Sequence, residues 1–344
     1  AWSWVDREFY DRGALDTTKI TYGAIRGMFE TLGDRNSYFV DPQEREVSET
    51  QLRGGFQGIG ANVELTADGK VRIVAPQEGS PAEEAGIRAG DIILQVDGRS
   101  IEGMNLIQAV ALIRGPKGTK VRLTLQRDGE AEPLTIEVSR ADIKVESVRS
   151  RSLDQNVAYV RVSQFGQQTA KELREAIQGL SKTNPSGLVL DLRGNPGGYL
   201  VSAVDAASLF LEDGAVLYEL RGNGERQEYR VKRGNVATTL PMVVLVDRGS
   251  ASAAEIVAGA LQDHQRARLV GEKTFGKGSM QSVHVLSDGS SVHVTIAHWL
   301  TPNERPIDGN GLLPDVAVEL PEAPTQGSDA VLEKAVEMLT GGKS

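Results

Sequence analysis

The sequence contains no cysteine, and aromatic and histidine residues are scarce. Only 5% of its 344 residues are aromatic, and four are histidines. The lack of cysteine excludes disulfide bonds, thiolate nucleophiles and cysteine-bound zinc. The histidines lack the short spacings and neighbouring carboxylates that are typical of metal ligands; they are His264, His284, His293 and His298. We therefore expect no metal site and no cofactor.

Excess positive charge and long apolar runs are missing as well. The net charge is −9, and no stretch combines basic with aromatic residues, so we expect no nucleic-acid partner. Apolar runs such as residues 242–246 are too short to cross a membrane. The sequence opens at Ala1 without a segment of export-signal type, and we expect any such signal to lie outside it.

The pattern along the chain divides it into four segments. Helix-type apolar spacing in residues 1–54 predicts a helical arm, and short alternating runs in residues 55–141 predict a compact β-domain. Residues 142–322 read as an α/β domain, and residues 323–344 as a tail with one amphipathic helix. The sequence therefore predicts a multi-domain α/β protein with an inserted β-domain and helical arms at both ends.

Strands and helices alternate in the α/β segment. We predict strands at 157–162, 188–192, 216–220 and 242–246, and helices at 169–180, 200–211 and 252–264. Such alternation is typical of parallel strands, whose ligands bind at the loops after the carboxyl ends.

Three loops of this segment have unusual composition. Residues 193–198 are rich in glycine, which favours an anion cradle but is also typical of a plain turn. Ser252 lies at a predicted helix start as a candidate nucleophile, yet Ser252 and Glu255 also form a capping-box pattern. Lys277 lies between two glycines and is either a buried base or an exposed turn lysine. Taken singly, each loop favours the structural interpretation.

Taken together, the loops resemble one family. Residues 191–198 (DLRGNPGG), 249–256 (GSASAAEI) and 275–281 (FGKGSMQ) occur in the order and at the spacing of the carboxy-terminal processing proteases, the tail-specific serine peptidases of family S41. The resemblance runs from about residue 11 to about residue 320, with Glu304 where the family commonly has glycine.

The resemblance implies a catalytic site and a fold. It implies Ser252 as nucleophile, Lys277 as general base and Gln281 as the partner that holds the lysine amine. The backbone N–H groups of Gly198 and Ala253 would form the oxyanion hole. The α/β domain would be a crotonase-like (ClpP/crotonase) core, and Ser250 would have no catalytic role.

For the β-domain the resemblance implies a PDZ-like module. Residues 80–87 and the pair Gly90-Asp91 are similar to the PDZ signature of the family. The loop that would bind a peptide C-terminus consists of Phe56, Gln57, Gly58, Ile59 and Gly60. Arg114 falls where the family has an arginine that links the PDZ domain to the protease, although an ordinary cation at a helix end fits equally well.

The function implied is a serine endopeptidase that acts on polypeptides with exposed C-termini. The resemblance further implies an extracytoplasmic location (periplasm or cell envelope), a homodimer through the terminal helices, and membrane-associated or adaptor partners upstream of the sequence. Three alternatives stay open. The chain could be a C-terminus-binding adaptor with a silent protease core, an acyl-CoA enzyme of the crotonase type, or a hydrolase in which Ser252 belongs to a Ser-His-Asp triad.

Overall fold

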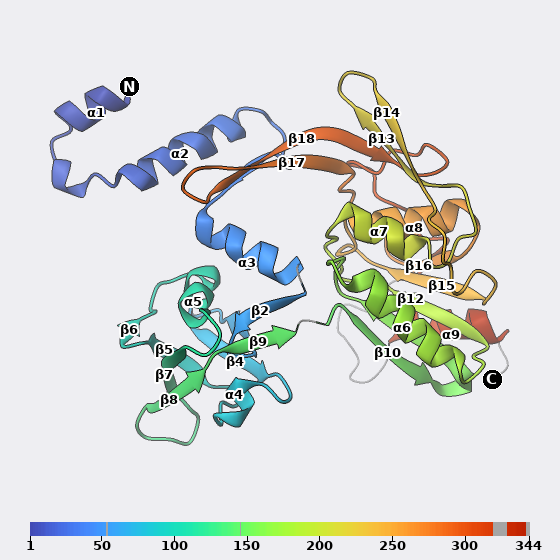
Figure 1. The fold of residues 1–344 in the computed structure, drawn as a ribbon, viewed down its shortest axis with the longest axis horizontal. Helices are drawn as coiled ribbons and strands as arrows, with labels where there is room; N and C mark the ends of the chain where they lie inside the picture. The colour runs from blue at the N-terminus through green and yellow to red at the C-terminus, as the bar shows by residue number, and fades with distance from the viewer. Residues whose placement is uncertain (53, 145, 319–328, 342–344) are drawn as a thin grey trace.

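The computed structural model describes residues 1–52, 54–144, 146–318 and 329–341 (Figure 1). The predicted boundary between residues 322 and 323 and the last residues, 342–344, lie outside these ranges. Helices occupy Trp2–Glu8 (α1), Thr17–Glu30 (α2), Pro42–Leu52 (α3), Pro81–Glu84 (α4), Leu106–Ile113 (α5), Thr169–Ser181 (α6), Leu200–Ala207 (α7), Ala253–Asp263 (α8) and Ala330–Thr340 (α9), with 3-10 turns at Arg12–Ala14 and Asp154–Asn156.

The strands lie in two halves of the chain, before and after residue 146, and one sheet combines strands of both halves, since Tyr38–Val40 pairs with Ser291–Leu300. The first half contains Tyr38–Val40 (β1), Gly55–Gly58 (β2), Ala61–Leu65 (β3), Val71–Pro76 (β4), Ile92–Val96 (β5), Arg99–Ser100 (β6), Lys120–Gln126 (β7), Leu134–Ser139 (β8) and Ala141–Lys144 (β9). The second half contains Val148–Leu153 (β10), Val157–Val162 (β11), Gly187–Asp191 (β12), Ala215–Arg221 (β13), Arg226–Arg230 (β14), Met242–Val246 (β15), Arg268–Gly271 (β16), Ser279–Val285 (β17), Ser291–Leu300 (β18) and Val316–Ala317 (β19).

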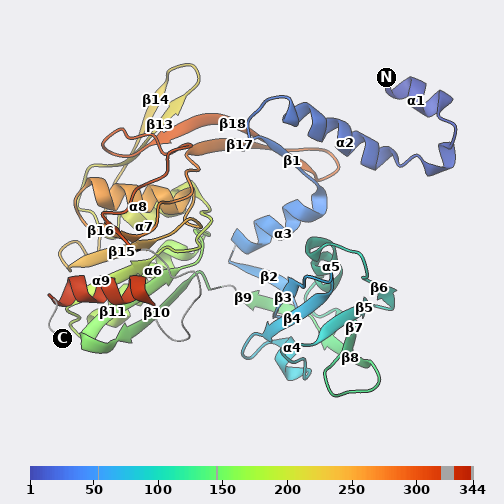
Figure 2. The same ribbon diagram turned by 180° about the vertical axis from the view of Figure 1, so that it is seen from behind.

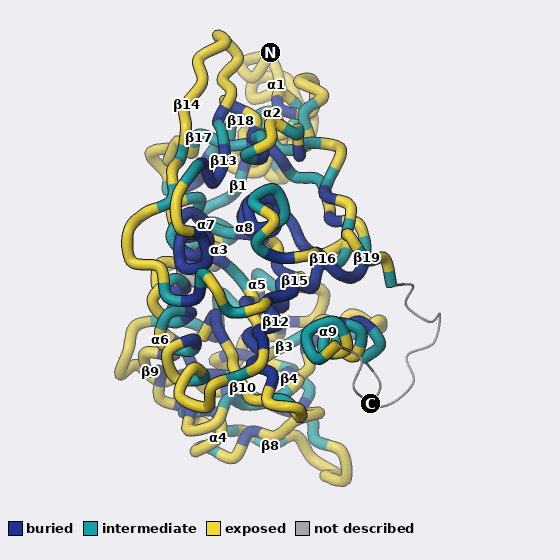
Figure 3. Tube along the Cα trace, turned by 90° about the vertical axis from the view of Figure 1, so that its right-hand side faces the viewer, coloured by how far each residue is buried: buried dark blue, intermediate teal, exposed yellow. Residues whose placement is uncertain are grey.

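The α/β domain is built on a six-stranded sheet in the order β10-β11-β12-β15-β16-β19. All neighbours in it are parallel except β10, which pairs antiparallel with β11. Side chains of α6, α7 and α8 pack on one face and those of α9 on the other. Every residue of β12 and β15 is consequently buried, as Figure 3 shows.

The predicted strand at 216–220 exists as β13, but the expectation that it joins the parallel sheet is wrong. β13 pairs antiparallel with β14 and β18, in a second sheet of order β1-β18-β13-β14 with β17 beside β18. A short turn around Gly224 leads directly into β14, whereas a parallel neighbour requires a longer crossover. The helix predicted at 200–211 also ends earlier, at Ala207.

The β-domain has a core of its own. Its sheet runs β3-β4-β5-β7-β8, with β6 beside β5, and α4 and α5 pack against the same apolar cluster. Asp91 is almost fully buried and accepts two hydrogen bonds from the Arg127 guanidinium. The ribbon of β2 and β9 joins this domain to the rest of the chain. The predicted helix at 106–113 is confirmed as α5.

The N-terminal arm lies mostly outside both cores. Figures 1 and 2 show α1 and α2 extending away from the body, and in α2 only Phe29 is buried. β1 adds an edge strand to β18, and α3 then leads into the β-domain. Within the described ranges, none of the helices has the length and apolar character needed to span a bilayer.

Candidate active site

Ser252 lies at a sharp turn between a buried strand and a helix. β15 ends at Val246 and α8 begins at Ala253, so the turn is at the carboxyl end of the parallel sheet. Ser252 has φ 56° and ψ −116°, a sparsely populated conformation for a residue with a side chain. Such strain at a strand-to-helix turn is typical of a nucleophile held at a fixed position.

The glycine loop after β12 packs directly on this turn. Gly197 and Gly198 have φ values of 106° and 144°. A Cβ atom on Gly197 would lie 2.7 Å from the Ser252 Cβ, so only glycine permits this approach. Buried Asn195 supports both loops, since its carbonyl accepts from Ala251 N at 2.9 Å and its side-chain oxygen from Gly197 N at 2.9 Å.

Two backbone N–H groups near Ser252 lack a partner within the described residues. They belong to Gly198 and Ala253, and neither donates a hydrogen bond there. Ala253 is fully buried, and buried N–H groups without a partner are rare in proteins. The two groups are therefore free to bind an oxygen atom that carries negative charge.

Glu255 is a buried carboxylate that joins the turn at Ser252 to the loop that contains Lys277. Its Oε2 accepts from Ser252 N and from Lys277 N, each at 2.9 Å. Its Oε1 accepts from Thr274 Oγ1 at 2.5 Å and from Gly276 N at 2.7 Å. The sequence pointed to Glu255 only as a helix cap, because partners so far along the chain are not visible in a local pattern.

Lys277 is half-buried, and burial lowers the pKa of its amine. Within the described part of the chain, no hydrogen bond joins the amine to the Ser252 hydroxyl. The Gln281 amide donates to Ser279 Oγ at 2.9 Å and to Thr295 Oγ1 at 3.3 Å. The structure therefore brings the Ser252 and Lys277 loops together while the two side chains are not bonded to each other.

Ser250 and the histidines have other partners. Ser250 is fully buried and donates to the Leu192 carbonyl at 2.8 Å. His264 bonds the Ala215 carbonyl, and His293 stacks on Tyr38 with 4.6 Å between the ring centroids. Within the described residues no histidine is hydrogen-bonded to Ser252, which argues against a Ser-His-Asp triad.

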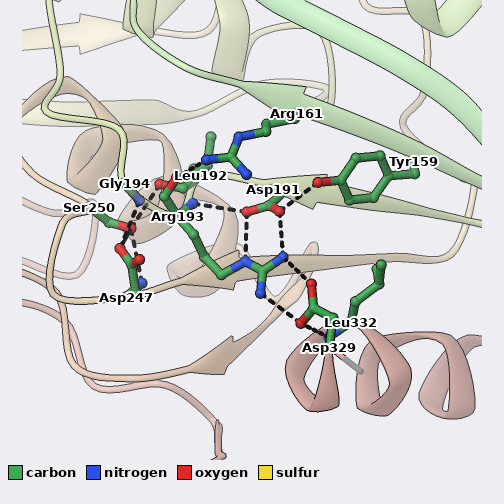
Figure 4. A network of polar contacts seen from close by, with 10 residues as sticks. All are labelled: Tyr159, Arg161, Asp191, Leu192, Arg193, Gly194, Asp247, Ser250, Asp329 and Leu332. Atoms are coloured by element: carbon green, nitrogen blue, oxygen red, sulfur yellow. Dashed lines mark hydrogen bonds and ion pairs between the residues drawn. The ribbon is translucent and has the colours of Figure 1, made fainter. Parts of the chain in front are cut away.

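A network of ion pairs supports the glycine loop from the other side of the sheet (Figure 4). Arg193 makes two-pronged contacts with both Asp191 and Asp329, at distances between 2.7 and 3.0 Å. Tyr159 donates to Asp191, and Asp329 caps α9 by accepting from Leu332 N. The residues that begin the glycine loop are thus tied to the C-terminal helix, a contact that the sequence did not reveal.

The β-domain has a groove of about 440 Å³ between β3 and α5. Phe56, Ile59 and Gly60 line it, and the N–H groups of Ile59 and Gly60 donate no hydrogen bond within the described residues. Gln57 and Gly58 are not part of the lining; the Gln57 amide donates to Asp142 instead.

Arg114 lies at the end of α5, where the groove meets the rest of the molecule. Its guanidinium stacks on the Phe56 ring, 4.3 Å from the centroid, and burial lowers its pKa. Its Nε and one terminal nitrogen are buried and have no hydrogen-bond partner among the residues that the structure describes. Arg114 is therefore not an ordinary solvated cation at a helix end.

Comparisons with known proteins identify the family. The sequence pattern of peptidase family S41 matches residues 156–318, which include all three loops. The carboxy-terminal processing protease CtpA of Bacillus subtilis is 41% identical over 94% of this chain and 68% of its own length. The chain belongs to peptidase family S41. The predicted recognition is thereby confirmed, and the protein is a hydrolase of peptide bonds.

Further S41 relatives resemble nearly the whole chain. The carboxyl-terminal-processing protease of Synechocystis is 38% identical to this chain, over 98% of this chain and 81% of the length of that protease. The solved photosystem II D1 C-terminal processing protease covers 92% of this chain and 91% of its own at 32% identity, with a TM-score of 0.55. A putative S41 protease from Bacteroides fragilis shares the fold, with a TM-score of 0.59 at 17% identity and coverage of 100% and 98%. A PDZ pattern matches residues 72–127, which confirms the predicted PDZ domain.

Proposed function

We propose that this S41 peptidase is a serine endopeptidase in which Ser252 is the nucleophile and Lys277 the general base. The observation that carries the proposal is the shared carboxylate of Glu255, which binds the backbone of both residues. The strained turn at Ser252 and the lowered pKa of Lys277 support the same assignment.

The proposed reaction is acyl transfer. The neutral Lys277 amine takes the Ser252 proton, and the hydroxyl oxygen attacks the carbonyl carbon of the peptide bond. The N–H groups of Gly198 and Ala253 bind the tetrahedral oxyanion, after which the protonated amine donates its proton to the leaving nitrogen. Water then attacks the acyl-enzyme, and Lys277 again accepts and returns a proton. The α/β domain would form a crotonase-like core.

The proposed resting state has Ser252 and Lys277 unbonded, as observed. Binding of a substrate tail to the PDZ domain would bring the two side chains into hydrogen-bond contact, and would turn the Gln281 amide toward the Lys277 amine. Arg114 is the proposed link, because two of its buried nitrogens have no hydrogen-bond partner in the described part of the chain and it lies at the edge of the groove.

The PDZ domain is proposed to select substrates by a free C-terminus. The N–H groups of Ile59 and Gly60, which donate to no described residue, would bind the terminal carboxylate, with β3 pairing with the peptide. The expected substrates are therefore polypeptides with exposed C-termini. Amidation of the substrate C-terminus should slow cleavage, and unchanged cleavage would refute the role of residues 56–60.

The proposal also includes a homodimer formed through the terminal helices and an extracytoplasmic location. Exposed apolar side chains on the N-terminal arm, such as Trp4 and Phe9, fit a homodimer interface. An extracytoplasmic site of action, with membrane-associated or adaptor partners, is proposed on the family likeness alone. Sedimentation of the intact chain tests the dimer, which a monomer at all concentrations would refute.

The central experiment compares turnover of an unfolded polypeptide by the wild type and by Ser252→Ala and Lys277→Ala. We expect both variants to lose activity, since each lacks one member of the reacting pair. Lys273→Ala is the matched control, because Lys273 is an exposed lysine of the same loop. Equal turnover by all of them would refute the Ser252/Lys277 mechanism, and no turnover by any would favour a C-terminus-binding adaptor with a silent core.

A further inference from the structure

Two chain segments connect the PDZ domain to the protease core, one before the domain and one after it, and both contact the same short segment of the core. We call residues 163–169, which follow β11, the junction loop. At the first connection, the Leu52 carbonyl accepts from Gln167 N at 2.9 Å, and a Cβ atom on Gly166 would lie 2.7 Å from that same oxygen. The end of α3 therefore packs on the junction loop without room for a side chain at Gly166.

The second connection is held by Ser147. Its carbonyl accepts from Ser163 N at 2.9 Å, and its hydroxyl lies 2.6 Å from the Thr169 hydroxyl. Thr169 is fully buried and also accepts from Gly166 N at 2.9 Å. A movement of the PDZ domain relative to the core thus pulls on both ends of the junction loop.

The middle of the junction loop pairs with the glycine loop of the active site. Phe165 N donates to the Gly197 carbonyl and the Phe165 carbonyl accepts from Tyr199 N, both at 2.8 Å. These bonds flank Gly198, and a Cβ atom on Gly198 would lie 2.2 Å from the Phe165 oxygen. Because the two backbone segments are in direct contact, a shift of the Phe165 backbone displaces the Gly198 peptide group.

The start of the junction loop lines the PDZ groove. Ser163 and Gln164 belong to the protease core, yet they face the same cavity as Ile59, Val63 and Val110 of the PDZ domain. An extended peptide bound there would contact both domains at once. The lining is largely apolar, which favours a tail with apolar side chains near its free carboxylate.

We propose that Ser163 and Gln164 complete the tail-binding groove, and that Phe165 conveys its occupancy to the oxyanion donor Gly198. Gln164 is then a substrate-binding residue contributed by the protease core, and Phe165 is a positioning residue. The inference rests on the proposed function, and it adds a contact route from the groove to the active site.

The first test measures binding alone. A fluorescent peptide with an apolar, free C-terminus is titrated in the Ser252→Ala background, so that cleavage plays no part. Gln164→Ala should weaken binding about fivefold, the effect of losing a side-chain hydrogen bond and its packing. Gln167→Ala is the matched control, because its exposed side chain lies outside the groove. Equal affinity of the Gln164 and Gln167 variants would overturn the composite groove.

The second test separates binding from catalysis. An end-blocked quenched peptide serves as substrate, and the tail peptide is added in trans. Phe165→Leu should bind the tail peptide like the wild type, while kcat in its presence falls about tenfold and KM stays constant. Phe165→Met has about the same volume as Phe165→Leu, but its longer, unbranched side chain can reach more of the space that the phenylalanine ring fills, so it should recover part of the stimulated rate.

Full stimulation of Phe165→Leu, or equal losses with and without the tail peptide, would overturn the role of Phe165. Thermal melting of each variant shows whether the fold is kept. If Ser252→Ala retained turnover, the proposed mechanism would be refuted. The affinities from the first test would still show whether Gln164 contributes to the tail-binding groove.

Discussion

The replacement Glu255→Gln tests how the buried carboxylate holds the active site. Each carboxylate oxygen of Glu255 accepts two hydrogen bonds, whereas an amide has one oxygen only. If the amide nitrogen took the place of Oε2, it would face two backbone N–H groups that cannot turn. If the amide nitrogen took the place of Oε1, it would face Gly276 N and the Thr274 hydroxyl. The hydroxyl group can rotate and accept a hydrogen bond from the amide nitrogen.

The second orientation is therefore favoured, and it leaves the Gly276 N–H without a partner. One unsatisfied buried donor costs about 1–3 kcal/mol, and the remaining bonds lose the strength that the charge gives them. We expect the free energy of unfolding to fall by about 3 kcal/mol. Because Gly276 precedes Lys277, kcat should fall about tenfold to a hundredfold at unchanged KM.

Urea unfolding and steady-state cleavage of an end-blocked peptide measure both effects. Glu272→Gln is the control, since the ion pair that the Glu272 side chain forms with exposed Arg248 at 3.4 Å is worth less than about 1 kcal/mol. If Glu255→Gln matched the wild type in stability and in kcat, the carboxylate would not hold the two loops, and the reasoning would be refuted.

Three further predictions concern the base, the glycine loop and the C-terminal helix. Because burial lowers the pKa of Lys277, kcat/KM should rise with pH and level off below the ordinary lysine pKa of about 10.4, and Lys277→Arg should be inactive at every pH; an active arginine variant would contradict this. Gly198→Ala should abolish turnover and lower the unfolding free energy by about 3 kcal/mol, whereas Gly222→Ala, with nothing within 4 Å of its added methyl, should change neither. The hydrogen bonds from Arg193 lower the pKa of Asp329, so that the stability from this pair is present at neutral pH and lost as the pH falls through the folded-state pKa. Asp329→Asn should therefore cost about 1 kcal/mol at pH 7, a value reduced for the partial exposure of the side chain, and clearly less at about pH 3; equal costs in urea unfolding at both would count against the pair.

Local patterns predicted the elements whose formation depends on neighbouring residues. The helix at 106–113 begins at a capping box of Asn105 and Gln108, and the strand at 157–162 is apolar at every position except Arg161, so both follow from short stretches of sequence. The strand β13 was predicted, but its sheet was not, because its partner β18 lies about eighty residues further along the chain. Glu304 has φ 60°, a backbone conformation that favours glycine, the residue that the family resemblance led us to expect there.

The candidate site likewise has features that the sequence predicted and contacts that only the structure shows. The order of the motifs was sufficient to identify the family, and the comparisons confirm it. The motifs did not reveal that Glu255 binds the lysine loop, that Asp329 holds Arg193, or that Gln164 lines the PDZ groove. Each of these contacts joins residues that are separated by other elements, and no spacing rule connects them.

The sequence by itself determined which residue types stand at the ends of the parallel strands, because strand and helix periods are local properties of the chain. Tertiary structure alone decided how those ends meet. The buried Glu255 carboxylate accepts four hydrogen bonds, the Gly198 N–H group donates none within the described ranges, and both PDZ connections contact the junction loop. The physical reason is that packing and hydrogen-bond saturation are satisfied across the whole fold, whereas sequence patterns report on one segment at a time.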